Sequence, residues 1–277
     1  MPHVSEEIQV RPQNERNTAR IGNVLGKKTK TGEFVTRPHD AEVRHERLRQ
    51  LSEQLLSKYG PNWHHHTLST LKVEAVSRVL YYHSLYQKIV DTPGVICEFG
   101  VQWGATLAEL INLRSILEPF NTSRIIYGFD TFEGFPSVDE KDGGFSSIGE
   151  YSSQKGHEET LEEILSLHES FAPQSQLKKF SLIKGDASET ILKWLDDNPH
   201  AIISMAIFDM DLYEPTKNVL KAILPRLTKG SVLVFDELNC GHFPGETRAV
   251  EEVLGINNLR LRKSPLQSYG SWAVYGE

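Results

Sequence analysis

Two hydrophobic patterns alternate along the chain from residue 95 onward. Short apolar runs, such as IIYGF and SVLVF, are separated by longer stretches in which apolar residues recur every three or four positions. The short runs are typical of strands buried on both faces, and the longer period is typical of amphipathic helices. Strands are therefore expected at 95–100, 124–130, 178–186, 203–211 and 230–237, and helices at 106–117, 158–171, 188–196, 215–227 and 245–254.

This alternation of strands and helices predicts an α/β fold. Successive strands would be connected by right-handed crossovers, which gives a Rossmann-like, mostly parallel sheet with helices on both faces. The closing stretch, LRLRKSPLQSYGSWAVYG, is expected to form two strands joined by a turn. That strand pair would add an antiparallel edge to the sheet.

The first 94 residues follow a different pattern. Residues 1–39 are polar with little apolar periodicity, and we expect them to form an arm that is partly ordered at best or that wraps a partner subunit of a homo-oligomer. Helical periodicity follows at 40–59 and at 69–91. We therefore expect three parts: the arm, N-terminal helices over 40–94 that pack on the core or cover the substrate, and an α/β domain over 95–277.

The charge and cysteine content exclude several classes of function. The chain has 30 Lys and Arg against 37 Asp and Glu, a net charge of −7, and binding to nucleic acid or to an anionic membrane needs a basic surface instead. Two cysteines cannot form a disulfide framework, and no apolar run approaches the ~20 residues of a membrane span. The first residues also lack the apolar core of a signal peptide. A cytoplasmic protein without nucleic-acid or membrane partners is expected.

Acidic residues follow almost every predicted strand. In open α/β sheets ligands bind beyond the carboxyl ends of the strands, so these side chains mark a candidate site. One acid in such a position is ordinarily a helix cap or a solvated turn, but a series at five strand ends favours a functional site. The acids are Glu98, Asp130, Asp186, Asp209 with Asp211, and Asp236 with Glu237.

The first strand leads into the turn EFGVQWG, which has the spacing E-x-G-x-x-x-G. Gly100 and Gly104 let the backbone approach a ligand closely. The three-glycine turn of nicotinamide-dinucleotide enzymes is missing, which disfavours such an oxidoreductase. The acid Glu98 suits instead a ligand with positive groups, such as the ammonium and sulfonium of S-adenosylmethionine.

Residues after the next two strands complete a predicted cofactor site. Asp130 is placed to accept hydrogen bonds from ribose hydroxyls, by the logic that holds in dinucleotide folds. Gly185 and Ala187 would frame the adenine, and Asp186 between them would accept from its amino group. The full predicted cofactor-binding set is Glu98, Gly100, Gly104, Thr106, Asp130, Thr131, Gly185, Asp186, Ala187 and Asp209.

With these motifs the sequence resembles class I S-adenosylmethionine-dependent methyltransferases, and more narrowly the macrocin and mycinamicin type of sugar O-methyltransferase. The resemblance covers about residues 70–277 and is most specific in FDTFEGFP (129–136) and DMDLYEPT (209–216). It implies a seven-stranded sheet, a bound Mg²⁺, and methylation of a deoxysugar hydroxyl on a secondary metabolite, a glycan or a nucleotide sugar. The loop 137–157 and the pair Asp236-Glu237, where the family usually shows two aspartates, depart from the family pattern.

Three of the acids form a candidate metal site. Asp209 ends the fourth predicted strand, and Asp236 and Glu237 end the fifth, so neighbouring strands would bring three carboxylates together. Hard oxygen ligands suit Mg²⁺, and without a cation the three groups would raise one another's pKa. By the resemblance, these residues correspond to the family's metal ligands. In the alternative interpretation, Glu237 and Asp211 cap the next helix or pair with a nearby Lys or Arg.

Two histidines are candidates for the base that takes the proton of the attacking hydroxyl. By the resemblance, His157 matches a family histidine with this role, and His242, which follows the metal acids, is the alternative. Asp209 is expected to act in catalysis as well, through the metal. The loop 137–157 would serve as a lid that keeps water from the reacting groups.

The leading hypothesis is therefore a Mg²⁺-dependent, S-adenosylmethionine-dependent O-methyltransferase acting on a sugar. A methyltransferase of the catechol or phenol type is the first alternative, because it would use the same three carboxylates with a flatter pocket. A non-catalytic relative that binds only the cofactor or a partner is the second. The acceptor sugar, the position methylated and the oligomeric state stay open at this stage.

Overall fold

The computed structural model of the protein describes residues 27–28, 34–35 and 39–277. The chain divides into two compact units, with the boundary between Val76 and Ser77. Apart from two short strands and His39, the predicted arm over 1–39 lies outside the described residues, and its subunit contact stays a prediction. The predicted unit over 40–94 is divided by this boundary, so that its last part lies in the second unit.

The first unit is mainly helical. Its strands β1 (Lys27–Lys28) and β2 (Phe34–Val35) pair in antiparallel fashion, and helix α1 (His39–Leu56) agrees with the helix predicted at 40–59. Within α1, the guanidinium of Arg49 binds Glu46 and Glu53 one turn to either side, a spacing that modestly stabilises an exposed helix. Three short helices follow: η1 (Gly60–Asn62), α2 (Trp63–His66) and η2 (Thr67–Thr70).

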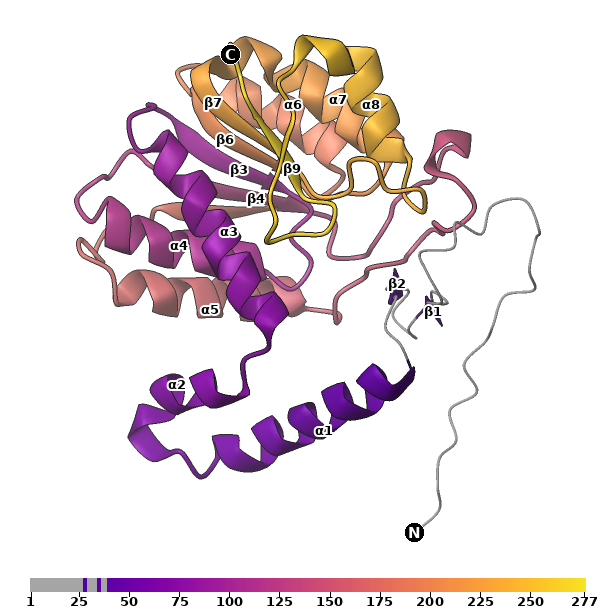
Figure 1. The fold of residues 1–277 in the computed structure, drawn as a ribbon. Helices are drawn as coiled ribbons and strands as arrows, with labels where there is room; N and C mark the ends of the chain where they lie inside the picture. Colours follow the sequence, from indigo (N-terminus) through magenta and orange to yellow (C-terminus); the bar gives the residue numbers. More distant parts are fainter. Residues whose placement is uncertain (1–26, 29–33, 36–38) are drawn as a thin grey trace. The chain divides into compact units, whose positions relative to one another are not determined.

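The second unit is built on one seven-stranded sheet with the order β5-β4-β3-β6-β7-β9-β8 (Figure 1). The first five of these strands are parallel, whereas β9 runs antiparallel to both β7 and β8. The predicted fold, a Rossmann-like sheet with an antiparallel C-terminal pair, is therefore confirmed. The strands are β3 (Val95–Phe99), β4 (Ile126–Asp130), β5 (Phe180–Lys184), β6 (Ile203–Phe208), β7 (Leu227–Phe235), β8 (Arg262–Lys263) and β9 (Ser271–Val274).

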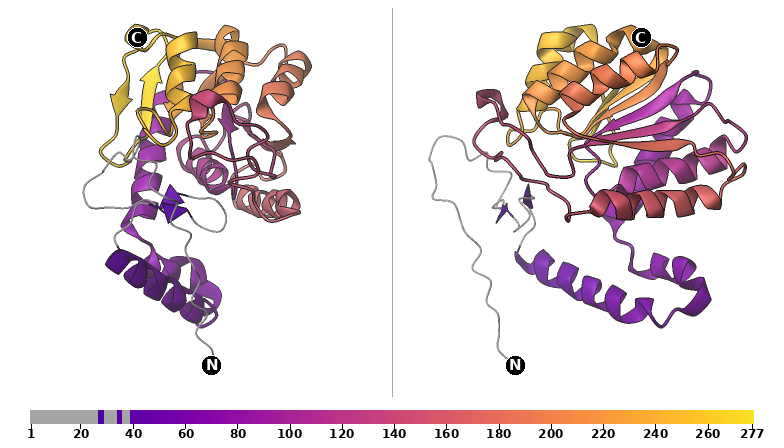
Figure 2. Two further views of the ribbon diagram at one scale, coloured as in Figure 1. Left: turned by 90° about the vertical axis from the view of Figure 1, so that its right-hand side faces the viewer. Right: turned by 180° about the vertical axis from the view of Figure 1, so that it is seen from behind.

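Helices cover both faces of this sheet, as Figures 1 and 2 show. Successive strand residues alternate between the two faces: Met205 and Ile207 of β6 pack with one set of helices, Ala206 and Phe208 with the other. Because both faces are buried, β6 is apolar along nearly its whole length, as the sequence pattern predicts. The first set is α3 (Val73–Ile89), α4 (Ala105–Leu117) and α5 (His157–Ser170), and the second is α6 (Ala187–Asp197), α7 (Tyr213–Ile223) and α8 (Gly245–Val253).

The predicted ends of helices and strands differ from the structure mainly near the carboxyl ends of the parallel strands. Strand β6 ends at Phe208 rather than at residue 211, because the chain turns sharply and Asp211 adopts a positive φ of 61°. Helix α7 begins at Tyr213 and tolerates Pro215 in its first turn, where backbone N–H groups have no helical partner. Three residues after α7 form the short helix η4 (Leu224–Arg226), and β7 follows directly. In the part of the chain that the structure describes, no helix is long and apolar enough to cross a membrane.

A buried arginine joins three elements at the opposite end of the sheet. Arg124 is 2% exposed and forms a two-point ion pair with Glu118, with N–O distances of 2.8 and 2.9 Å. Its guanidinium also donates to the carbonyl oxygens of Ile89 and Gly94 and to the hydroxyl of Ser204, at 2.7 to 2.9 Å. Since every donor has a partner, the charge is compensated, and the end of α3 and the starts of β3 and β6 are held together.

Replacing this arginine is expected to destabilise the second unit. Arg124→Met would leave the buried Glu118 carboxylate and several carbonyl groups without partners, at a cost of about 3–5 kcal/mol in the free energy of unfolding. Denaturant unfolding followed by circular dichroism measures the change. Arg248→Met, at a position whose side chain is 62% exposed, is the control and should stay within about 0.5 kcal/mol of the wild type. Similar stabilities for the two variants would contradict the interpretation.

Candidate active site

A cavity of about 430 Å³ opens where the carboxyl ends of β3, β4 and β6 meet. Strand β3 lies at the centre of the parallel strands, with β4 and β5 on one side and β6 and β7 on the other. The chain therefore leaves β3 in one direction and later returns to its other side, and this reversal of strand order opens a crevice in α/β sheets. The residues that line the cavity all lie in the second unit, between Arg78 and Glu237.

The turn after β3 requires a glycine. The N–H of Gly100 donates to the carbonyl of Phe129 at 2.9 Å, and the N–H of Asp209 donates to the carbonyl of Phe99 at 2.8 Å. A Cβ atom on Gly100 would lie 1.9 Å from the carbonyl oxygen of Asp209, and the glycine has a φ of 91°. Both the contact and the backbone conformation exclude a larger residue. This close approach brings the ends of β3 and β6 together.

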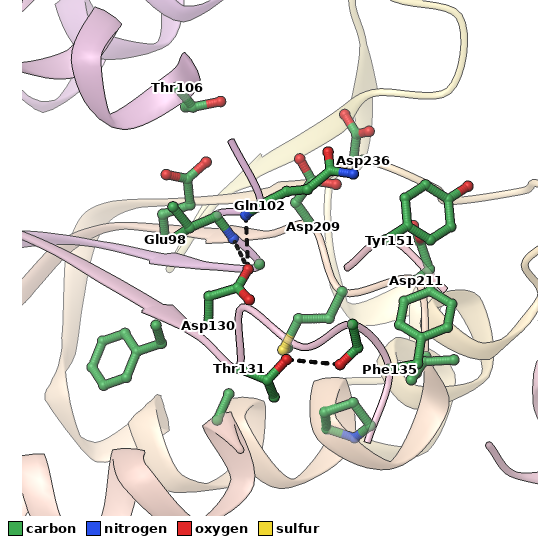
Figure 3. A pocket seen from close by; sticks show the side chains of 18 of the residues that line it. Glu98, Gln102, Thr106, Asp130, Thr131, Phe135, Tyr151, Asp209, Asp211 and Asp236 are labelled. Carbon is green, nitrogen blue, oxygen red and sulfur yellow. Dashed lines mark hydrogen bonds between the residues drawn. The ribbon is translucent and has the colours of Figure 1, made fainter. Parts of the chain in front are cut away.

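Asp130 organises the floor of the cavity. One of its carboxylate oxygens accepts the backbone N–H groups of Val101 and Gln102 at 2.6 and 2.8 Å (Figure 3). The other accepts the N–H of Phe132 at 2.5 Å. These bonds fix the turn after β3 relative to the turn after β4. Asp130 also lines the cavity, as its predicted role with a ribose requires, but the turn-fixing bonds were not predicted from the sequence.

The third strand end carries a helix cap. Asp186 accepts the N–H of Ser188 at 2.8 Å and so caps α6. The N–H of Gly185 donates to the carbonyl of Asp130 at 2.9 Å, which joins this turn to the previous one. Gly185, Asp186 and Ala187 all line the cavity, so the sequence-predicted adenine frame lies at its wall.

A wall of the cavity comes from Phe135 and Tyr151, which lie just before and within the loop 137–157 that the sequence predicts to be a lid. Phe135 exchanges backbone hydrogen bonds of 3.0 Å with Gly149 and Glu150, and its ring packs 5.2 Å from that of Tyr151. Further along the loop, Asp142 is 1% exposed and accepts the N–H of Tyr213 at 2.6 Å. The loop is therefore fastened to the first residue of α7.

The structure brings most of the predicted cofactor residues to this cavity. Gly104 and His157 are not among the lining residues. Gly104 instead packs under α5, where an added Cβ would lie 2.2 Å from Leu161. His157 lies against Trp103, with ring centroids 4.7 Å apart and its Nε2 3.4 Å from the Trp103 carbonyl oxygen. The predicted residues that do line the cavity are Glu98, Gly100, Thr106, Asp130, Thr131, Gly185, Asp186, Ala187, Asp209, Asp236 and Glu237.

Burial, and for two of them a neighbouring charge, raises the pKa of the carboxylates at the ends of β6 and β7. Burial and the charge of Asp236 raise the pKa of Asp209 to about 7, and burial followed by Asp236 does the same for Glu237. Burial also raises the pKa of Asp236. Figure 3 shows both Asp209 and Asp236 among the residues that line the cavity. The charge of Asp236 thus acts on Asp209 and Glu237 as predicted, whereas the raised pKa of Asp236 itself comes from burial.

The three acids are not arranged as a finished metal site. Within residues 27–28, 34–35 and 39–277, no group of three or more His, Cys, Asp or Glu side chains has the geometry to hold a metal ion. One carboxylate oxygen of Glu237 is buried without a hydrogen-bond partner, and the backbone N–H of the same residue donates to buried Glu246 at 3.0 Å. The carboxylate oxygens are suited to a hard cation, but at their present spacing they do not form a binding site for one.

Arg78 lies among these acids and was not singled out from the sequence. Its guanidinium lies 3.6 Å from the carboxylate of Asp209 and donates to the hydroxyl of Thr106 at 2.6 Å. Burial alone would lower the pKa of Arg78, but Tyr82, Asp209 and the neighbouring acids raise it, so the charge is secure. Nothing in the sequence distinguishes this helical arginine among 30 Lys and Arg residues, because its role comes from where α3 packs.

Asp211 is one of the acids that mark the candidate site in the sequence, where a helix cap or an ion pair is its alternative role. It lines the cavity at 8% exposure, and burial and then Asp209 raise its pKa well above the ordinary value. His242, the alternative base, is 9% exposed, packs its ring 4.8 Å from that of Phe145, and has a pKa lowered by burial. Of Asp211, His157 and His242, only Asp211 contributes to the cavity surface.

Removing one charge from the acid cluster is expected to stabilise the metal-free protein at high pH. The pKa of Asp209 is about 7 in the folded state against an ordinary 3.8, so the folded protein holds a proton that the unfolded chain loses between these values. Stability therefore falls as pH rises from about 4 to 7. Asp209→Asn should raise the free energy of unfolding by about 1–2 kcal/mol at pH 8, or roughly 2–8 °C in Tm, and much less at pH 4.5.

Thermal unfolding in the presence of EDTA at the two pH values tests this. Asp197→Asn is the matched control, because that carboxylate is exposed on α6 and pairs only with Lys193 at the surface. The control should change Tm little at either pH. An Asp209→Asn variant that is no more stable than the wild type at pH 8 would show that the cluster carries no repulsive strain.

Comparison with known proteins gives a consistent assignment. Residues 39–275 match a family model described as macrocin-O-methyltransferase (TylF). The solved structure of CalS11, a calicheamicin methyltransferase, is 35% identical with a TM-score of 0.82, over 91% of this chain and 99% of that one. The apo structure of CalS11, described as a TDP-rhamnose 3'-O-methyltransferase of calicheamicin biosynthesis, is 33% identical with a TM-score of 0.76, over 88% and 97%. The O-methyltransferase NovP shares the fold, at 15% identity and a TM-score of 0.52 over 72% and 79%. No curated protein matches the chain in sequence.

Proposed function

We propose that this chain, which belongs to the macrocin O-methyltransferase family, methylates a hydroxyl of a deoxysugar with S-adenosylmethionine as donor and a divalent cation at its acid cluster. The family makes it an O-methyltransferase. The proposal of a sugar acceptor is carried by one observation, the 33–35% identity over nearly the whole length of CalS11. By that likeness the acceptor is a sugar linked to a nucleoside diphosphate, or one already attached to a secondary metabolite such as an antibiotic.

The cavity has the chemistry that this donor needs. When bound, S-adenosylmethionine supplies a methyl group on a positively charged sulfur. Seven carboxylate side chains line the cavity and favour a cationic ligand. Glu98 is 1% exposed, and one of its carboxylate oxygens is buried without a partner, which suits an ammonium group. The residues that would hold the donor are those of the predicted cofactor set that line the cavity, with Asp130 at the ribose and Asp186 at the adenine.

The acid cluster is the proposed site of the cation. Asp209, Asp236 and Glu237 offer hard oxygen donors, and their raised pKa values support the proposal that added positive charge would be stabilising there. A divalent ion such as Mg²⁺ would supply Lewis acidity and a template for two neighbouring hydroxyls of the sugar. Binding would require these side chains to move closer together than they are.

A base must take the proton of the attacking hydroxyl. His157 is the base favoured by the sequence, and its contact with Trp103, a lining residue, puts it at the rim of the cavity. Asp211 is the candidate favoured by position, because it faces the cavity and its raised pKa makes it a better proton acceptor than an ordinary aspartate. His242 remains a third candidate behind Phe145.

The surroundings of the site keep water out during the transfer. Methyl transfer to an alkoxide neutralises two opposite charges, so it is favoured in a site of low polarity. The rings of Phe135 and Tyr151 supply an apolar wall, and the loop 137–157 is the proposed cover. We also propose that residues 40–94 contribute to the substrate cover, that the arm contacts a second copy of the chain, and that the enzyme acts in the cytoplasm.

Methyl transfer to defined acceptors tests the function. The protein is incubated with methyl-labelled S-adenosylmethionine and either TDP-rhamnose, related TDP-deoxysugars, or catechol, in the presence of Mg²⁺ or EDTA. Label transfer to a sugar nucleotide that EDTA abolishes and Mg²⁺ restores is the expected result. Transfer that persists in EDTA would refute the cation, and transfer to catechol alone would favour the phenol-type enzyme. Binding of the donor without transfer to any acceptor would favour a non-catalytic relative.

The pH dependence of turnover distinguishes between the candidate bases. If His157 is the base, His157→Gln should lower kcat by about 10²–10⁴-fold and remove the limb of the profile set by an imidazole. If Asp211 is the base, Asp211→Asn should have that effect, and His157→Gln should change mainly KM. S-adenosylhomocysteine binding by calorimetry is the control, because loss of the base alone should leave cofactor affinity within about threefold. Variants that both keep near wild-type kcat would rule out both residues.

A further inference from the structure

Among the described residues that line the cavity, Arg78 carries the positive charge and seven side chains carry carboxylates. This imbalance favours a cationic ligand but opposes an anionic group, which would be repelled unless it lay directly against the guanidinium. The acids are Glu98, Asp130, Asp186, Asp209, Asp211, Asp236 and Glu237.

The donor proposed above carries both kinds of charge at its amino-acid end. Its α-ammonium group suits the acids, whereas its α-carboxylate needs a cation or several N–H donors. The backbone N–H groups of Val101, Gln102 and Phe132 beside the cavity are already bonded to Asp130. Arg78 is therefore the charged side chain of the lining that can compensate a carboxylate.

The guanidinium of Arg78 has donors to spare. One N–H is used by Thr106, whose hydroxyl accepts at 2.6 Å, and the distance of 3.6 Å to Asp209 is longer than an ordinary hydrogen bond. The Nε atom is buried without a partner. The plane is also steadied by Tyr82, whose ring centroid lies 5.0 Å from the guanidinium carbon. An arginine whose guanidinium is held in place by such contacts and keeps an unused N–H is suited to binding a carboxylate through two hydrogen bonds.

A matching acid lies on the other side of the same hydroxyl. Thr106 lies close enough to Glu98 to lower the pKa of its carboxyl group against the larger effect of burial, and one oxygen of that carboxyl group is buried without a partner. Arg78 and Glu98 thus flank one threonine at the start of α4, with one unused donor and one unused acceptor. Opposite charges on the two sides of one hydroxyl group are complementary to the ammonium and carboxylate groups that an amino acid carries on its α-carbon.

We propose that Arg78 binds the α-carboxylate of the methyl donor, with Thr106 as the hydroxyl that positions it and Glu98 as the partner of the α-ammonium group. The inference rests on the proposed function, because it concerns how the same site recognises its donor. It assigns to α3, a helix expected from the sequence only to pack on the core or cover the substrate, a direct part in cofactor recognition.

Binding of cofactor analogues by calorimetry, in EDTA, tests the assignment without turnover. The ligands are S-adenosylhomocysteine, its decarboxylated analogue, which keeps the amine, and 5'-methylthioadenosine, which lacks the whole amino-acid end. The variant Arg78→Gln should weaken binding of S-adenosylhomocysteine by about 10–100-fold and leave the affinity for the other two ligands within about threefold. Arg78→Lys keeps the charge but cannot bind a carboxylate through two parallel hydrogen bonds. Its affinity for S-adenosylhomocysteine should therefore lie between those of the wild type and Arg78→Gln. Arg248→Gln, at an exposed position outside this cavity, is the control.

Three outcomes would overturn the proposal. Equal loss of affinity for all three ligands would mean that Arg78 only supports the fold of the cavity. Unchanged binding of S-adenosylhomocysteine to Arg78→Gln, with tighter binding of Mn²⁺ to the same variant, would make Arg78 the counter-ion of the acid cluster. If Arg78→Gln does not fold, equal affinity of the wild type for S-adenosylhomocysteine and its decarboxylated analogue would reject a carboxylate contact. A wild type that binds none of the ligands would refute the proposed function itself.

Discussion

The site depends on placing many carboxylates of like charge in one poorly solvated crevice. The ends of β3 and β6 approach so closely that Gly100 cannot carry a side chain, and the acids that follow these strands and β7 then share the same space. In water such charges would be screened, but in a buried crevice each raises the free energy of the others. Arg78 lies among these acids, 3.6 Å from the carboxylate of Asp209, and offsets part of the repulsion between them.

In the proposed function, this electrostatic strain would favour cationic ligands over anionic ones. A crevice that is costly when empty gains free energy from a ligand or ion of positive charge, so binding energy is available at the place where chemistry is proposed to occur. Elsewhere in the second unit, a buried ion pair is fully compensated. At Arg124 and Glu118, far from the crevice, every donor of the guanidinium has a partner. The acids at the ends of β6 and β7, by contrast, face a single cationic side chain among the residues that line the cavity, that of Arg78.

The fold and most of the cavity could be predicted from the sequence, because both follow from residue patterns within short segments of the chain. Apolar runs give the strands, and the rule that ligands bind beyond the carboxyl ends of parallel strands turns the acids after them into a site. Arg78 and Asp142 could not be found in this way. Each acts through a neighbour far away in the chain, Asp209 and Tyr213 respectively, and a pattern along one strand or helix carries no information about such a partner.

The bond between Asp142 and the backbone of Tyr213 has a mechanical consequence. Tyr213 is the first residue of α7 and follows Asp211 by two positions, so the loop 137–157 and the acids after β6 are anchored to one rigid segment. Any displacement of that loop to admit a bulky acceptor must either break a buried hydrogen bond or pull on the turn that presents Asp211. Movement of the loop 137–157 and movement of the acids after β6 would then occur together rather than independently.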